Sequence, residues 1–364
     1  MRLKLSTEEF STALQKASEF TGKGREMEIT KDIMLVASDG FLYINASNIT
    51  SACKIRVPCD IQKEGALVVE GKIINLVKTI RKDDISLSLT NSNKLSINSN
   101  FYLGVRSNGV DKFPEMPLPS KDTKSFDIPR DEFIEEVQKV DFACNNSDMD
   151  MEGMVFLGGN ITYATNKYKF ACLQEPQFDF ECFFPKSFIR QISDLSNEFK
   201  LFIEDGRIYV NDEDLFFMMK VPSIAAPRSG VEQLLNKELN VAAIYDFDIK
   251  ELIHKIRQIR TLNSLVTMYF TEDKIYMAGN DNTENISHSL QSVNLKAKEF
   301  KEETLTTYTI KYLLDCLRGF DKPEITIEAG NKGITYFQEN DLVGALASTK
   351  CRNRDKILDM IKEG

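Results

Sequence analysis

The segment LSTEEFSTALQKA, Leu5 to Ala17, carries a pattern that decides how the rest of the chain is read. Two later stretches share it: IPRDEFIEEVQKV at 128–140 and FDIKELIHKIRQI at 247–259. Phe10, Phe133 and Leu252 occupy the same place in the three stretches, 123 and 119 residues apart. Positions three, four and seven residues further on are mostly apolar, which is the spacing of an amphipathic helix. One helical unit is therefore repeated three times along the chain.

A second helix and further strands complete each unit. The second helices are predicted in GKIINLVKTIRK (71–82), PKSFIRQISDLS (185–196) and IKYLLDCLRGFD (310–321). Alternating stretches with Asn, Asp or Gly at the turn predict β-hairpins after them, at 85–98, 200–211 and 324–337. Hairpins are also expected after the first helices, for example at 33–45 and 266–278. Each unit thus contains a helix followed by antiparallel strands, twice.

These repeats predict an α+β protein of three similar domains, each with two helices on antiparallel sheets. We place the domains at 1–122, 123–242 and 243–349, with a C-terminal tail at 350–364 that could form a short helix. The proline-rich loop at 114–124 marks the first boundary, and the second lies near 236–243.

Composition excludes several classes of protein. No run of 18 apolar residues exists and the N-terminus has no apolar signal segment, so a soluble cytoplasmic protein without membrane contact is expected. The seven cysteines form no C-x-x-C pair, and only two histidines accompany them. We therefore expect no metal and no cofactor. The net charge of −9 argues against nucleic-acid binding unless the positive charges are sorted onto particular faces.

Helix packing predicts how many chains would be needed to enclose DNA. Six repeated helices at about 8–10 Å spacing close into a circle too narrow for a duplex. Twelve leave a hole of roughly 28 Å, whereas B-form DNA is roughly 20 Å wide. Two chains, joined as a symmetric homodimer, would fit around duplex DNA with a layer of water.

The charges on the predicted helices agree with a polyanion at the centre of such a ring. Acidic residues concentrate on the first helices of domains 1 and 2 and in loops, while basic residues share faces of the other four helices. Asp315 interrupts one of these faces. The residues expected to face DNA are Lys23, Arg25, Lys78, Lys82, Lys186, Arg190, Lys250, His254, Arg257, Lys311, Arg318 and Lys322. A weakly positive lining attracts phosphates without reading bases.

The order of these elements resembles the bacterial β sliding clamp, the processivity subunit of the replicative DNA polymerase. The resemblance covers about residues 1–349. It rests on VASDGFLYINASN, the loop GVDKFPEMP, the opening DIPRDEFIEEVQKVDFACNNSD of the second domain, and TIKYLLDCLRGFDKPEITIEA. ATNKYKFAC (164–172) lies where that family has its A-T-D-G-H-R-L-A signature, with Asn166 to Lys169 replacing the D-G-H-R core. The family's closing M-P-M-R-L is absent.

The resemblance implies a head-to-tail dimer that encircles duplex DNA, performs no catalysis, and binds short peptides of the polymerase and the clamp loader. Carried over by position, the peptide groove between domains 2 and 3 would use Met151, Thr165, Tyr168, Lys169, Phe170, Pro222, Pro227 and Leu346. The dimer interface would place Phe101 and Leu103 of domain 1 against Leu262 of the other chain. The break in alternation at 166–169 suggests a loop at the edge of the groove.

Three other functions compete with this interpretation. An enzyme is disfavoured, because the chain has no Gly-rich phosphate loop, no G-x-S-x-G and no Cys–His arrangement outside the repeats. A clamp-like module that binds polymerase or clamp-loader peptides without forming rings would not need the apolar residues at the predicted interface. A two-domain trimeric clamp is disfavoured by three repeats in one chain.

Overall fold

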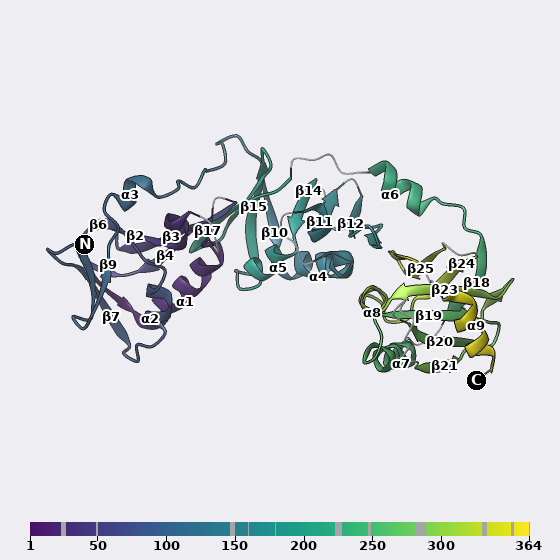
Figure 1. Ribbon diagram of the computed structural model, residues 1–364. Coiled ribbons are helices and arrows are strands. Elements are labelled where there is room, and N and C mark those ends of the chain that lie inside the picture. Colours follow the sequence, from purple (N-terminus) through teal and green to yellow (C-terminus); the bar gives the residue numbers. More distant parts are fainter. Residues whose placement is uncertain are drawn as a thin grey trace. The chain divides into compact units, whose positions relative to one another are not determined.

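The computed structural model describes residues 1–22, 27–48, 50–145, 150–158, 160–178, 180–222, 228–246, 249–280, 289–329, 333–350 and 353–363. The chain divides into two compact units. The first unit contains Met1–Asp131 and Arg190–Ser223, and the second contains Glu132–Ile189 and Ile224–Gly364. Both units combine antiparallel sheets with helices (Figure 1), so the predicted α+β fold class is confirmed.

The first unit is built on two sheets. The five-stranded sheet runs β5 (Asp60–Lys63), β1 (Arg2–Ser6), β7 (Asp84–Leu89), β8 (Lys94–Ile97), β9 (Phe101–Gly104). The eight-stranded sheet runs β10 (Ser125–Pro129), β15 (Glu198–Glu204), β16 (Arg207–Asn211), β17 (Leu215–Lys220), β4 (Ser51–Pro58), β3 (Phe41–Ser47), β2 (Ile33–Ser38), β6 (Gly65–Val69). Helices α1 (Thr7–Ala17), α2 (Ile73–Val77) and α3 (Gly109–Lys112) accompany them. Helices α4 (Arg130–Val140) and α5 (Ser187–Ile192) span the division between the units.

The second unit also has two sheets. The nine-stranded sheet runs β14 (Cys182–Pro185), β11 (Met154–Gly158), β12 (Ile161–Thr165), β13 (Lys169–Leu173), β26 (Leu342–Ala347), β25 (Ile334–Glu339), β24 (Glu324–Glu328), β18 (Val241–Asp246), β22 (Glu299–Phe300). The four-stranded sheet runs β21 (Leu290–Asn294), β20 (Lys274–Asn280), β19 (Leu265–Phe270), β23 (Thr304–Thr309). Its helices are α6 (Arg228–Leu235), α7 (Lys250–Arg260), α8 (Ile310–Arg318) and α9 (Arg354–Glu363).

The predicted hairpins are confirmed, and their turns follow from the residues at them. Asp39 and Gly40 join β2 to β3 with φ of 54° and 81°. Asp205 and Gly206 join β15 to β16 with φ of 48° and 67°. Two successive positive φ angles match the twist of antiparallel strands, and Asp–Gly adopts them at little cost.

The repeated first helices bury the residues that the pattern selects. Phe10 and Phe133 have no exposed surface, and Leu252 is 2% exposed. Ser6 caps the start of helix α1, since its hydroxyl accepts a hydrogen bond from the Glu9 amide at 3.3 Å. These helices therefore anchor their apolar stripes to the sheets.

The second helices are shorter than predicted. Helix α2 ends at Val77 rather than Lys82, because the amides of Thr79 and Ile80 bond the carbonyls three residues back, which is 3₁₀ geometry. Helices α5 and α8 end at Ile192 and Arg318. Periodicity predicted their presence correctly and their C-terminal ends wrongly.

Strand pairing continues across the predicted domain boundaries. Strand β4 of the first repeat pairs with β17 of the second, and β13 of the second pairs with β26 of the third. The two junctions are equivalent: the second residues of β4 and β13, Ala52 and Phe170, lie opposite the fourth residues of β17 and β26, Met218 and Ala345. The compact units thus join parts of adjacent repeats, and the three-domain division remains a prediction.

The C-terminal tail forms a helix, as its sequence suggested. Helix α9 (yellow in Figure 1) packs on β19 and β20. Ile357 and Ile361 are buried there in a cluster with Tyr269, Ala278 and Leu305. The tail therefore covers one face of the four-stranded sheet.

Candidate functional site

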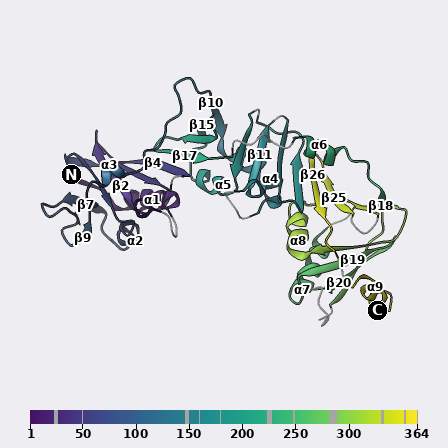
Figure 2. The ribbon, with the colours of Figure 1, turned by 45° about the horizontal axis from the view of Figure 1, so that its top comes forward.

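A cavity of about 240 Å³ opens in the second unit where β13 meets β26. Strands β12 and β13 with the turn between them form one side, and α6, beside β25 and β26, forms the other (Figure 2). The lining residues are Tyr163, Thr165, Lys167, Tyr168, Lys169, Phe170, Gly230, Val231, Leu234, Ile334, Ala345 and Ala347. Most of these side chains are apolar or aromatic, so the cavity can accept the apolar side chains of a peptide.

Packing beneath the cavity fixes its floor. Tyr163, Phe170 and Ala345 are nearly buried and belong to one hydrophobic cluster with Val231 of α6. The rings of Tyr163 and Phe170 stack with centroids 6.3 Å apart. Small side chains at the end of β26 leave the space that an incoming side chain could fill.

The turn at 166–168 is held by a buried asparagine. The Asn166 side-chain oxygen accepts hydrogen bonds from the amides of Tyr168, at 3.1 Å, and Lys169, at 2.8 Å. Its amide nitrogen donates to the side-chain oxygen of Asn145 at 2.9 Å. Lys167 adopts a φ of 72°. The loop predicted from the broken alternation is therefore a tight, internally bonded turn.

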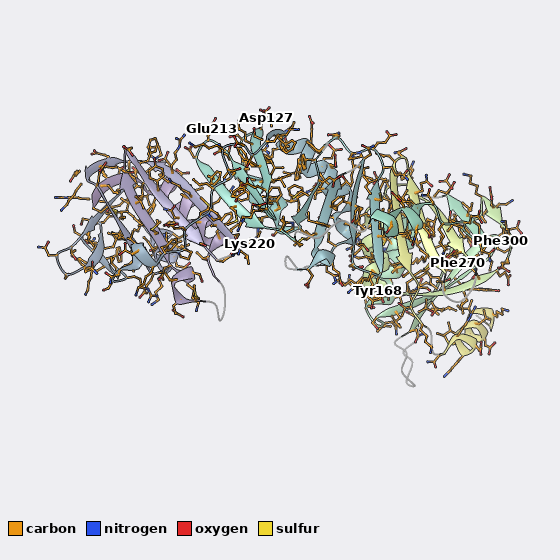
Figure 3. The ribbon with its side chains drawn as sticks, turned by 90° about the horizontal axis from the view of Figure 1, so that it is seen from above. Asp127, Tyr168, Glu213, Lys220, Phe270 and Phe300 are labelled. Atoms are coloured by element: carbon orange, nitrogen blue, oxygen red, sulfur yellow. The ribbon has the colours of Figure 1, made fainter. Side chains whose placement is uncertain are left out.

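This turn presents an aromatic ring at the rim of the cavity. Tyr168, labelled in Figure 3, is 54% exposed. Its ring stacks on that of Tyr312 from α8, with centroids 5.4 Å apart and planes at 17°. The rim is thus a rigid aromatic surface rather than a free side chain.

A buried ion pair lies behind that surface. Lys169 is 2% exposed, and its Nζ lies 2.9 Å from Oδ2 of Asp315 on α8. The same ammonium donates to the carbonyl of Phe142 and lies 5.5 Å from the centre of the Tyr312 ring. Asp315, which interrupts a basic face in the sequence, is therefore the partner of a lysine that lines the cavity. Tyr312 was not predicted, because only the fold brings α8 to this turn.

The structure brings Thr165, Tyr168, Lys169 and Phe170 together on the cavity but not every predicted groove residue. Leu346 is 1% exposed and lies outside the lining, because alternation along β26 turns its neighbours at 345 and 347 toward the cavity instead. This corrects the expectation for Leu346.

The cavity wall expected from Pro222 is formed by other residues. Pro222 does not line the cavity, and Gly230, Val231 and Leu234 of α6 do. The apolar spacing of Val231 and Leu234 is helical and could have identified them from sequence. The Met151 side chain and Pro227 lie outside the described residues.

Basic residues gather between two helices of the first unit. An open cleft of about 660 Å³ lies between α1 and α2 and is lined by Lys78, Arg81 and Lys82 together with Glu8 and Asp83. The three basic side chains are exposed. Arg81 was missed because the predicted basic face assumed a helix through residue 82, whereas α2 ends at Val77 and the side chains beyond it do not follow helical spacing.

The other predicted DNA-facing residues differ in their exposure and in the acidic residues near them. The exposed ones on α7 and α8, which lie side by side, are Lys250, His254, Arg257, Lys311 and Arg318, and Lys322 follows α8. Lys186 lies 3.3 Å from Asp141, and Arg190 lies 3.6 Å from Glu19, so acidic neighbours offset part of their charge. Lys23 and Arg25 lie outside the described residues.

Two strands present exposed apolar residues at sheet edges. Strand β9 ends the five-stranded sheet, and there Phe101 is 42% exposed, Tyr102 is 56% exposed and Leu103 is half-buried. Strand β21 ends the four-stranded sheet; its Leu290 is 38% exposed, and Leu262, just after the adjoining α7, is 58% exposed. Tyr102 and Leu290 were not among the predicted interface residues.

Within the described ranges, no group of three or more His, Cys, Asp or Glu side chains is placed to hold a metal ion. In the same part of the chain, no helix is long and apolar enough to cross a membrane.

Comparisons with known proteins agree with this geometry. Residues 1–117 match the family model for the N-terminal domain of the DNA polymerase III beta subunit. No curated protein matches the chain.

Solved structures of bacterial sliding clamps share the fold over nearly the whole chain. A DNA polymerase sliding clamp from Caulobacter crescentus is 16% identical with a TM-score of 0.83, and 96% of this chain covers 100% of that one. The clamp from Bacillus subtilis is 15% identical with a TM-score of 0.81, covering 96% and 99%. The Helicobacter pylori beta clamp bound to a DNA ligase peptide is 17% identical with a TM-score of 0.79, covering 96% and 100%. The predicted resemblance is confirmed, at low identity.

The buried ion pair behind the cavity predicts an asymmetric response to substitution. Asp315→Asn leaves the Lys169 ammonium buried without a counter-charge, so we expect the free energy of unfolding to fall by about 3–5 kcal/mol. Lys169→Met should cost less, because Asp315 is 26% exposed and can be hydrated. Urea unfolding measures both, with Lys298→Ala, which breaks an exposed pair with Glu324, as a control that leaves the midpoint unchanged. Equal losses in all three variants would contradict the prediction.

Proposed function

We propose that this chain, which has the fold of the solved sliding clamps and matches the DNA polymerase III beta N-terminal domain over residues 1–117, is a sliding clamp that closes around duplex DNA as a homodimer. In this role it is not an enzyme, and it acts in the cytoplasm, where it tethers a replicative polymerase to its template. We also propose that the chain forms three clamp domains, at 1–122, 123–242 and 243–349. The observation that carries it is the pair of unpartnered apolar sheet edges.

The repeat indicates how these edges are used. In the first and second repeats, the third strand after the first helix (β4, β13) pairs with the third strand after the second helix of the following repeat (β17, β26). By the same order, β21 of the third repeat and β9 of the first repeat each lack this partner among the described strands. We infer that β21 pairs with β9 of a second copy, which closes a ring of two chains. Unpaired apolar edges would otherwise promote aggregation.

Binding to DNA follows from charge rather than from base readout. The exposed basic residues of α7 and α8, and those in the cleft between α1 and α2, would contact phosphates. Contacts to phosphates carry no sequence information and weaken as salt rises. The chain as a whole has a net charge of −9, which keeps the attraction weak enough for sliding.

Partner binding is assigned to the cavity between β13, β26 and α6. The solved Helicobacter pylori clamp carries a DNA ligase peptide. We propose that here short linear peptides of the polymerase and the clamp loader insert apolar side chains against Phe170, Val231 and Leu234. Tyr168 would offer an aromatic rim to the same peptide.

The dimer is tested by mass in solution. Light scattering at tens of micromolar should give about 83 kDa, twice the chain mass of 41.5 kDa. Leu103→Asp combined with Leu262→Asp should give monomers with an unchanged circular dichroism spectrum, because charges then lie in the apolar interface. Leu118→Asp, at a residue that is 69% exposed and outside both edge strands, is the control and should stay dimeric. A monomeric wild type would overturn the ring.

The DNA-facing assignment is tested by charge reversal. Changing Lys78, Arg81 and Lys82 to Glu should lower retention of the clamp on nicked circular DNA and reduce the slope of log affinity against log salt by about 0.9 per lost phosphate contact. The charge-matched control changes Lys112, Lys121 and Lys124 to Glu. These residues are exposed and lie in or beside the proline-rich loop at 114–124. Equal retention in the two variants would show that the cleft between α1 and α2 does not face DNA.

The peptide groove is tested by filling it. Ala347→Phe should block the cavity and weaken binding of a fluorescent Gln-Leu-x-Leu-Phe-type peptide by roughly tenfold or more, since the bound apolar side chains lose their space. Ala66→Phe adds the same ring at an exposed strand position in the first unit and should leave affinity unchanged. Unaltered peptide binding by Ala347→Phe, with an unchanged melting temperature, would place the groove elsewhere.

A further inference from the structure

The chain that follows the edge strand β9 crosses from one sheet of the first unit to the other. Val105 forms an antiparallel bridge with Val69 of β6, and the Arg106 amide donates to the Val68 carbonyl at 2.9 Å. Gly109 permits this close approach, since a Cβ there would lie 2.8 Å from the Arg106 side chain and 2.9 Å from that of Val68. The residue that directly follows the last residue of β9 is thus already paired with the eight-stranded sheet.

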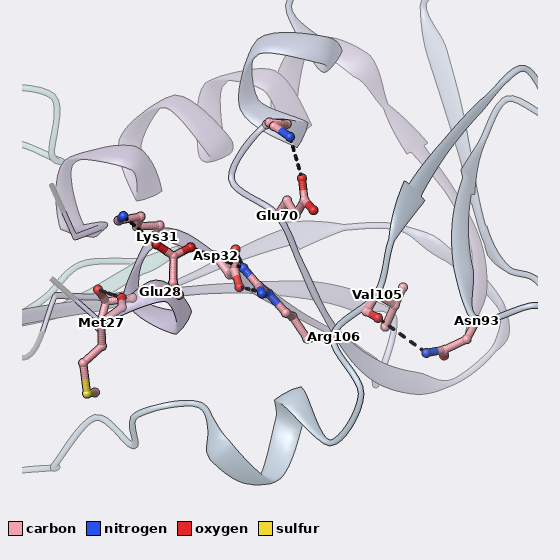
Figure 4. Close-up of polar contacts among 10 residues, drawn as sticks. Met27, Glu28, Lys31, Asp32, Glu70, Asn93, Val105 and Arg106 are labelled. Atoms are coloured by element: carbon pink, nitrogen blue, oxygen red, sulfur yellow. Dashed lines mark hydrogen bonds and ion pairs between the residues drawn. The ribbon is translucent and has the colours of Figure 1, made fainter. Parts of the chain in front are cut away.

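An ion pair secures the crossing. Arg106 Nε lies 2.6 Å from Oδ2 of Asp32, and a terminal nitrogen of the same guanidinium lies 3.4 Å from Oδ1 (Figure 4). The Asp32 side chain is 3% exposed, whereas that of Arg106 is 42% exposed. Glu28 adds a longer contact of 3.9 Å. The hydrogen bond to Asp32 is the main cause that raises the pKa of Arg106.

The position of Asp32 explains why this contact is rigid. Asp32 ends a short 3₁₀ helix at Glu28–Lys31 and directly precedes β2, a strand inside the eight-stranded sheet. A carboxylate buried there needs a cation, because an unpaired charge away from water is costly. Contact at two points with a planar guanidinium fixes the orientation of Arg106 relative to Asp32 as well as the distance between them. Arg106 is therefore tied to a part of the fold that cannot shift easily.

By contrast, β9 itself is weakly held. It contains four residues and forms its ladder with β8 alone among the described strands. An isolated edge of this kind frays unless something fixes its ends. Asp32 and Arg106 supply that fixed point at its C-terminal end.

We propose that Asp32 and Arg106 are positioning residues of the subunit interface, which hold β9 in the place where a second copy of the chain can pair with it. This inference rests on the proposed dimer through β9 and β21. Neither residue needs to touch the second copy; they act through the strand that does.

The test is the dimer dissociation constant of Asp32→Asn, measured by sedimentation well below the melting temperature. We expect it to rise roughly tenfold or more, with faster amide exchange in Phe101–Gly104. Arg106→Lys keeps the charge but loses the two-point contact. Its dimer dissociation constant should therefore lie between those of the wild type and Asp32→Asn. The matched control is Asp214→Asn, which breaks the Arg56–Asp214 pair: its Nε–Oδ distance is also 2.6 Å, but both side chains are exposed.

The outcomes separate this inference from the proposed function. A monomeric wild type would overturn both. A dimeric wild type whose dissociation constant and β9 exchange are unchanged in Asp32→Asn would overturn the positioning role alone. If Asp32→Asn does not fold, Arg106→Lys decides: weaker dimers with faster β9 exchange support the role, and wild-type behaviour overturns it. Weakening by Asp214→Asn to the same extent would also overturn it, since the effect would then follow from any lost ion pair.

Discussion

Main-chain pairing between strands of successive repeats is the interaction on which the other features depend. Each repeat by itself would leave strand edges with unsatisfied amides and carbonyls. The ladders β4–β17 and β13–β26 satisfy them and join the repeats into continuous sheets. The cavity exists only because β13 and β26 are adjacent, and the helices carry their basic residues on sheets that these ladders extend. The same requirement leaves β9 and β21 in need of a partner.

Features fixed by neighbouring residues were predictable from the sequence. Asp39–Gly40 specifies a hairpin turn, and the spacing around Phe10 specifies a buried helical stripe, without reference to the rest of the fold. The orientation of Leu346 was not predictable, because which face of β26 meets the cavity depends on its register with β13. That register is set by pairing between residues about 175 positions apart in the chain, such as 170 and 345.

Buried charge was the other part of the site that sequence reasoning could not resolve. Asp315 is one of 55 acidic residues, and its pattern in the helix placed it only as a break in a basic face. The fold gives it a partner, Lys169, 146 positions away. Arg106 and Asp32 are likewise 74 positions apart. Counting charges along a helix therefore describes exposed faces well and misses those acids that the tertiary structure neutralises.

The side-chain volumes at the two ladders favour the observed strand pairings over exchanged ones. In one junction a small residue, Ala52, lies opposite a large one, Met218; in the other the order is reversed, with Phe170 opposite Ala345. Had β4 met β26 instead, two alanines would leave a void, and β13 against β17 would crowd Phe170 into Met218. Voids and crowding both destabilise a packed layer. Side-chain volume thus adds to the specificity with which each of these strands pairs in the folded chain.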